Sequence, residues 1–107
     1  MPDFGEVVDR LAATIASRRG GDPAASWSAR LIAEPELAAK KLAEEAVELA
    51  LAVVAERRPS VIAESADLIY HWLAALEAAG VSLSEVAAAL EAREGRSGVA
   101  EKSARKP

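Results

Sequence analysis

Apolar residues recur every three or four positions along most of this chain, which is the spacing of amphipathic helices. One series follows Asp3 and another follows Ser82; their members are Phe4, Val7, Val8, Leu11 and Ile15, and then Leu83, Val86 and Leu90. No segment alternates apolar and polar residues over the length of a β-strand. The pattern therefore predicts an all-α fold, a bundle of about four to five helices.

Capping and breaking residues set the expected ends of the first two helices. Asp3, with Glu6 three positions later, predicts the N-cap of a first helix that ends near Arg19. Residues 20–23 (GGDP) then begin a loop that runs to about Ser28. A short helical turn is expected over residues 28–33.

Three longer helices are expected in the rest of the chain. The first covers residues 35–58, with Pro35 as its first residue and Pro59 preventing its continuation. The second covers residues 60–79, with Ser60 as N-cap and Gly80 as a left-handed terminator. A capping box of Ser82 and Glu85 opens the last, which runs to Gly95.

Two acidic motifs lie on the central pair of expected helices. Glu45 with Glu48, and Glu64 with Asp67, are three residues apart, so each pair shares a helix face and its Cβ atoms lie roughly 5–6 Å apart. Carboxylate oxygens suit Mg²⁺, or alternatively Mn²⁺, and such ions are usually shared with substrate phosphates. The two pairs predict a metal site and a substrate that is a phosphate ester or anhydride.

An ordinary solvated helix face is the alternative interpretation of these acids. Pairs such as Lys40 with Glu44, or Lys41 with Glu45, have i,i+4 spacing and contribute only a few tenths of a kcal/mol. This interpretation suffices for either motif alone. Two motifs on consecutive antiparallel helices with a short connector favour the metal site.

Composition limits the size, partners and compartment of the protein. The 107 residues suit one domain over residues 1–94, followed by a polar tail over 95–107 that we expect to be mobile at its end. Alanine-rich helices bury little area each, which favours a homodimer or a larger homo-oligomer. A net charge of −4 argues against nonspecific nucleic-acid binding. Without cysteine, a signal segment or an 18-residue apolar run, the expected location is the cytoplasm and not a membrane.

Four short motifs occur in order along most of the chain: 27–31 (WSARL), 41–48 (KLAEEAVE), 66–71 (ADLIYH) and 93–98 (REGRSG). In this combination they resemble the phosphoribosyl-ATP pyrophosphohydrolase family, within the all-α, MazG-like nucleotide pyrophosphohydrolases. The resemblance implies Mg²⁺-dependent hydrolysis of phosphoribosyl-ATP to phosphoribosyl-AMP and pyrophosphate. That reaction is the second step of histidine biosynthesis, and the resemblance implies a cytoplasmic homodimer or higher assembly.

The acidic motifs supply the expected metal ligands and catalytic groups. Glu45, Glu48, Glu64 and Asp67 are the expected metal ligands. Glu44 is expected to orient or deprotonate the attacking water, or to complete the metal's surroundings. Lys41 is expected to bind a phosphate or to stabilise the departing pyrophosphate, or else to be an ordinary salt-bridge partner.

The remaining candidates are expected at the substrate-binding site. His71 lies one turn beyond Asp67, where a supporting role is expected. Arg93, Arg96 and Ser97 can donate hydrogen bonds to phosphate. The same segment also has the pattern of an ordinary helix C-terminus, and the resemblance favours substrate binding. Trp27 and Arg30 either stack on or clamp the substrate, or pack the loop against the long helix.

Two alternative functions stay open on sequence alone. A house-cleaning nucleoside triphosphate pyrophosphatase of the same superfamily would use the same acids and differ mainly in the 93–98 segment. A non-enzymatic helical interaction module would carry the acids as a solvated or partner-binding stripe. Thermal melting with added magnesium distinguishes this module from an enzyme, because a ligand selective for the native state raises apparent stability. An unchanged melting temperature would favour the module.

Overall fold

A computed structural model describes residues 1–95 of this chain, together with Gly98 and Lys102. Within these residues it contains five helices and no strand. The helices are α1 (Phe4–Ala16), α2 (Trp27–Ala33), α3 (Pro35–Val54), α4 (Arg58–Ala79) and α5 (Leu83–Ala92). The all-α prediction is confirmed.

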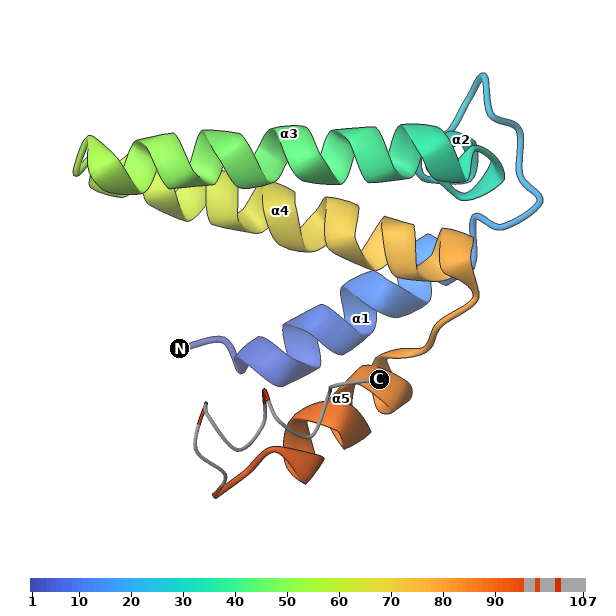
Figure 1. Cartoon of the computed structure of the whole chain (residues 1–107). Coiled ribbons are helices and arrows are strands. Elements are labelled where there is room, and N and C mark those ends of the chain that lie inside the picture. Colours follow the sequence, from blue (N-terminus) through green and yellow to red (C-terminus); the bar gives the residue numbers. More distant parts are fainter. Residues whose placement is uncertain (96–97, 99–101, 103–107) are drawn as a thin grey trace.

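The two longest helices, α3 and α4, form an antiparallel hairpin that is the main body of the molecule (Figure 1). The short helix α2 packs against both of them near the start of α3, and α1 packs against α4. Figure 1 draws α5 beyond α1, on the side away from α3, and α5 contributes no buried residue. The hairpin therefore carries both acidic motifs, while α1 and α2 support one of its ends.

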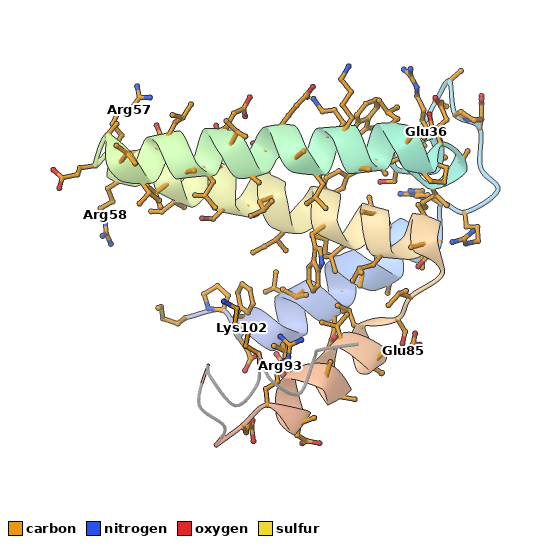
Figure 2. The ribbon with its side chains drawn as sticks, in the orientation of Figure 1. Glu36, Arg57, Arg58, Glu85, Arg93 and Lys102 are labelled. Carbon is orange, nitrogen blue, oxygen red and sulfur yellow. The ribbon has the colours of Figure 1, made fainter. Side chains whose placement is uncertain are left out.

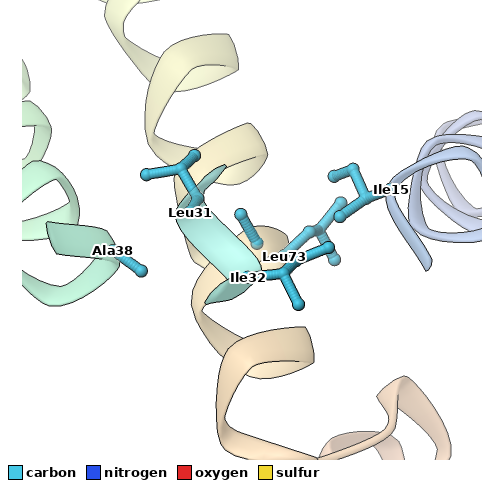
Figure 3. Packing of buried hydrophobic residues seen from close by; sticks show 6 residues of the cluster. Ile15, Leu31, Ile32, Ala38 and Leu73 are labelled. Carbon is cyan, nitrogen blue, oxygen red and sulfur yellow. The ribbon is translucent and has the colours of Figure 1, made fainter. Parts of the chain in front are cut away.

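A small apolar core ties this supported end together. Figure 3 shows the side chains that meet there, which come from α1, α2, α3 and α4. They are Ile15, Leu31, Ile32, Ala38, Leu73 and Ala74. Ile15 and Leu31 are the largest fully buried side chains. Because the core lies at one end, the other half of the hairpin is held mainly by contacts between α3 and α4.

Several expected helix ends are confirmed by local hydrogen bonds. Asp3 accepts the backbone N–H of Glu6 at 2.9 Å, and Ser82 with Glu85 forms a complete capping box. Gly80 terminates α4 in the left-handed region at φ 71°. The helices α1 and α5 end at Ala16 and Ala92, a little before the expected Arg19 and Gly95.

The turn between α3 and α4 differs from the sequence prediction. The helix α3 ends at Val54 and not near Arg58, and α4 begins at Arg58, so Ser60 is not its N-cap. Pro59 instead lies inside the first turn of α4, where its missing N–H has no intrahelical partner to lose. Glu56 adopts the left-handed φ of 56° that closes α3, a position usually taken by glycine.

One face of the hairpin exposes large apolar side chains. Val47, Leu51 and Val54 follow i, i+4, i+7 spacing on α3, and their side chains are 58%, 62% and 82% exposed. We call these three residues the outer apolar face. On α4, Ile62 is 61% exposed. This part of α4 is therefore not buried within the single chain, although the apolar composition of the helix predicts burial.

No single helix in the described part of the chain is long and apolar enough to cross a membrane. Only α4 and α5 taken together, bent by 105° at their junction, satisfy the length and composition test.

Candidate metal and active site

The side of α3 that faces α4 carries small residues on either side of a carboxylate. The buried residues of α3 are Ala38, Glu45 and Ala52, which are spaced two turns apart. Alanine at both flanking positions allows the helix backbones to approach closely around Glu45. The sequence thus places an acid where a helical hairpin ordinarily buries a large apolar side chain.

Glu45, Glu48 and Glu64 come together across the hairpin, and we call them the acidic cluster. Each offers a carboxylate oxygen, and these oxygens all lie within 4.8 Å of one another. Glu45 is buried at 8% exposure, whereas Glu48 is exposed and Glu64 is half-buried. The cluster therefore opens to solvent on one side and is enclosed on the other.

The enclosed side of the acidic cluster lacks hydrogen-bond donors. One oxygen each of Glu45 and Glu64, the Oε2 atoms, is buried without a hydrogen-bond partner. Buried polar atoms are almost always satisfied, so two orphaned acceptors side by side call for a positively charged group. An all-oxygen donor set of carboxylates fits a hard divalent cation such as Mg²⁺.

The electrostatics of the acidic cluster agree with its geometry. Burial raises the pKa of Glu45, and the neighbouring Glu48 and Asp67 charges raise it further. Burial, together with the hydrogen bond and the charge of Glu48, also raises the pKa of Glu64 to about 6. Both shifts mean that the cluster resists carrying its full negative charge unless a cation compensates for it.

Asp67, the fourth expected ligand, is not part of the acidic cluster. Its side chain is exposed, and it does not share the 4.8 Å grouping. Its charge nevertheless contributes to the raised pKa of Glu45, so the carboxylate lies near the cluster. The structure brings together three of the four expected ligands and leaves Asp67 beside them.

Lys41 and Glu44 form an ion pair one turn before the acidic cluster on α3. Lys41 Nζ lies 3.0 Å from Glu44 Oε2. Their hydrogen bond lowers the pKa of Glu44 and raises the pKa of Lys41. Glu44 therefore stays ionised next to a cluster that is easily protonated, which is the state a proton acceptor needs.

His71 is buried and belongs to a network that joins α4 to α2. Its Nε2 accepts a hydrogen bond from Trp27 Nε1–H at 3.3 Å, which leaves the ring proton on Nδ1. Nδ1–H donates to the backbone oxygen of Asp67 at 2.9 Å. The imidazole is thus held by two partners, and its supporting role stays a prediction.

Trp27 and Arg30 lie together at the first turns of α2. The Arg30 guanidinium is 5.7 Å from the centre of the Trp27 ring and also pairs with Glu34 at 3.2 Å. Trp27 is 41% exposed, so part of its ring is open to solvent. The ring packs against α4 through His71.

The third group of expected substrate contacts lies at the other end of the chain. Figure 2 draws Arg93 by α5, on the side of the molecule away from α3. The structure therefore does not bring Arg93 to the acidic cluster of its own chain. Arg96 and Ser97 lie outside the described residues.

Sequence reasoning missed the hydrogen bond between Trp27 and His71, a second link between α2 and α4, and the exposure of the hairpin. Ser28 Oγ and Tyr70 Oη are 2.5 Å apart and form a second link between α2 and α4. Nothing in the local pattern signals that contact, because the two residues are far apart in sequence. The outer apolar face has a signal, since Val47, Leu51 and Val54 fall on the side of α3 opposite its buried positions.

Comparison with known proteins gives a consistent result across the chain. A model of the family described as phosphoribosyl-ATP pyrophosphohydrolase matches residues 8–94. A relative from Caulobacter vibrioides (strain NA1000 / CB15N), named phosphoribosyl-ATP pyrophosphatase, is 60% identical over 100 residues and covers 94% of each chain. Relatives of the same name from Caulobacter sp. (strain K31) and Cereibacter sphaeroides (strain ATCC 17029 / ATH 2.4.9) are 58% and 51% identical. The first of these alignments covers 98% of each chain, and the second covers 92% of this chain and 97% of the relative.

Proposed function

The chain belongs to the phosphoribosyl-ATP pyrophosphohydrolase family, and from this premise we propose that it hydrolyses phosphoribosyl-ATP to phosphoribosyl-AMP and pyrophosphate with the help of Mg²⁺. The reaction is the second step of histidine biosynthesis, and we propose that it takes place in the cytoplasm. The observation that carries the proposal is the acidic cluster, in which three carboxylates converge and two oxygens lack donors.

Glu45, Glu48 and Glu64 are the residues that would hold Mg²⁺, and Asp67 would join them by a change of side-chain rotamer. Bound there, Mg²⁺ supplies positive charge to phosphate oxygens and lowers the pKa of the attacking water. The support for this assignment is chemical: the donor set is all oxygen, and one side of the acidic cluster is open to solvent. Dedicated Mg²⁺ sites usually consist of a few carboxylates that leave room for substrate phosphates.

Glu44 is the residue we assign to the water. The Lys41 hydrogen bond lowers the pKa of Glu44, so its carboxylate stays ionised, the form that can orient the water or take up its proton. Lys41 would exchange this ion pair for the leaving pyrophosphate as negative charge develops there. Exchange is inexpensive because both side chains are partly exposed, and exposed ion pairs contribute at most about 1 kcal/mol.

The proposed substrate-binding residues form two groups. Trp27, Arg30 and His71 lie where α2 meets α4, and we propose that Trp27 and Arg30 contact the substrate while His71 holds them in place. Arg93, Arg96 and Ser97 remain candidates for substrate phosphates. Since Arg93 lies away from α3 in its own chain, its contribution would require a second copy of the chain.

We further propose that the protein is a homodimer that buries the outer apolar face. Large apolar patches on a monomer are uncommon and mark interaction sites. Val47, Leu51 and Val54 form a continuous stripe on α3, and a self-complementary stripe suits the two-fold symmetry of most homo-oligomers.

A product assay tests the proposed function. The purified chain is incubated with phosphoribosyl-ATP, and with a panel of ordinary and modified nucleoside triphosphates, in Mg²⁺ and in EDTA. We expect pyrophosphate and phosphoribosyl-AMP from the first substrate only, and only with Mg²⁺. Faster hydrolysis of a modified nucleoside triphosphate would instead indicate a house-cleaning pyrophosphatase, and no hydrolysis of any substrate would support a non-enzymatic module.

A further inference from the structure

Trp27 is an aromatic ring held at a fixed angle on the surface near the candidate active site. Its indole N–H is bound to the buried His71, and its ring stands edge-on to the imidazole at an interplanar angle of 75°. Part of the ring is nonetheless open to solvent, and a planar guanidinium already lies over it. A fixed ring with one planar partner and an open approach is suited to stacking another planar group.

The position of Trp27 relative to the acidic cluster fits a nucleotide lying along the hairpin. Glu64 belongs to the cluster, and His71, which receives the indole N–H, lies two turns further along α4. That separation is about 10 Å at the rise of an α-helix. A triphosphate held at the cluster would therefore place its ribose and base within reach of α2.

The opposite end of the hairpin offers no comparable surface. Residues 49–63, which cover the end of α3, the turn and the start of α4, contain no aromatic side chain. The aromatic side chains of the hairpin, Tyr70 and Trp72, lie in the half of α4 toward α2. A base that stacks in this site therefore has one direction available.

On these grounds, and resting on the proposed function, we infer that the adenine ring of phosphoribosyl-ATP stacks on the indole of Trp27, with the Arg30 guanidinium on its other face. Arg30 is half exposed and contacts Glu34 and the Trp27 ring, so it can move outward from the indole to admit a flat ring between them. The substrate then lies with its phosphates on Glu45, Glu48 and Glu64 and its base on α2. Trp27 is in this arrangement a specificity residue, because sugar phosphates without a base leave it uncovered.

Steady-state kinetics with two variants separate stacking from mere packing of α2. Trp27→Leu removes the aromatic face, whereas Trp27→Phe keeps a ring but removes the hydrogen bond to His71. We expect Trp27→Leu to raise the KM for phosphoribosyl-ATP about fivefold or more with kcat within about twofold, and Trp27→Phe, which keeps a ring to stack on, to raise the KM clearly less. A similar rise in both variants would show that the hydrogen bond matters and the ring does not, and would overturn the inference.

Fluorescence gives a second readout that does not depend on the stability of the leucine variant. The chain has two tryptophans, so Trp72→Phe leaves Trp27 as the sole reporter, and Trp27→Phe leaves Trp72 as the matched control. We expect phosphoribosyl-AMP to quench the emission of Trp27 and not that of Trp72, while pyrophosphate quenches neither. Unchanged Trp27 emission at saturating phosphoribosyl-AMP, or equal quenching of both reporters, would overturn the inference.

The same proteins separate this inference from the proposed function. If phosphoribosyl-ATP is hydrolysed and Trp27 stays silent in both experiments, the base binds elsewhere and the proposed function stands. If no pyrophosphate is released from phosphoribosyl-ATP by the parent protein, the proposed function fails first, and the inference fails with it.

Discussion

Replacing Glu45 with glutamine tests the acidic cluster most directly, because it removes one buried charge and keeps the shape of the side chain. Glu45 is 8% exposed, and its Oε2 has no hydrogen-bond partner. The amide of a glutamine at this position can donate to the orphaned oxygen of Glu64. The variant Glu45→Gln should therefore stabilise the metal-free protein and weaken the bound metal.

The size of the metal-free effect follows from the distances within the acidic cluster. Two unit charges 4.8 Å apart repel by about 1 kcal/mol in water, and by about 3–4 kcal/mol at the effective dielectric constant of a protein surface. Because Glu48 is exposed, we take the lower value. Relief of about 1 kcal/mol raises the Tm of a domain of this size by about 5 °C.

The magnesium effect has the opposite direction. Magnesium at about a hundredfold excess over its Kd stabilises the native state by about 2.7 kcal/mol, which corresponds to more than about 10 °C in Tm. Losing one of three clustered carboxylates should reduce that rise to a third or less in Glu45→Gln. The assay is thermal unfolding followed by circular dichroism, in EDTA and in increasing Mg²⁺, at one protein concentration.

The variant Glu91→Gln is the matched control, because Glu91 is exposed on α5 and outside the acidic cluster. We expect this control to follow the parent protein in both conditions. The reasoning is refuted if Glu45→Gln lowers the Tm in EDTA, or if it keeps the full magnesium-induced rise while the control behaves as the parent.

Four other predictions follow from the same structure. In EDTA, the free energy of unfolding should fall as the pH rises from about 4.5 to about 6, because the raised pKa of Glu64 makes the folded chain keep a proton that the unfolded chain releases. Urea titrations over this pH range measure the free energy of unfolding, and an increase with pH would contradict the prediction. Glu48→Gln and Asp67→Asn should each abolish pyrophosphate release with unchanged helical circular dichroism, and turnover retained in both would refute the assignment of these ligands. Glu56→Gly should raise the free energy of unfolding by about 1 kcal/mol, since glycine takes the left-handed φ of 56° without strain, and an unchanged urea midpoint would argue against it. Leu51→Glu should shift the protein from dimer to monomer in sedimentation equilibrium at micromolar concentration, and an unchanged mass would exclude the outer apolar face as the interface.

Helix ends were predictable from sequence where a local hydrogen bond decides them. Asp3, Gly80 and the pair Ser82 and Glu85 each act within a few residues, so their types and spacing were enough. The turn between α3 and α4 was not predictable in this way. Closure of the hairpin places Glu56 in a left-handed conformation that its side chain disfavours, and tertiary packing outweighs that local preference.

In the candidate site, too, contacts set by local spacing were predictable and contacts between distant segments were not. Spacing within one helix places Glu45 beside Glu48, and the short connector brings Glu64 opposite them, so the acidic cluster was within reach of sequence reasoning. The contact of Trp27 with His71 joins two residues far apart in sequence. It depends on how α2 folds back over α4, and no local pattern specifies that.

The interior of the hairpin explains why its exterior is apolar. Ala38, Glu45 and Ala52 occupy the most buried side of α3, so these positions add little hydrophobic stabilisation and include a charge. Leu37, Leu42 and Leu49 are half-buried, whereas Val47, Leu51 and Val54 lie opposite the buried positions and stay exposed. A helix arranged in this way becomes stable when its outer side is covered and its inner charge is neutralised. Dimerisation would cover the outer side, and a divalent cation would neutralise the inner charge. Both would then stabilise the fold as well as serve the reaction.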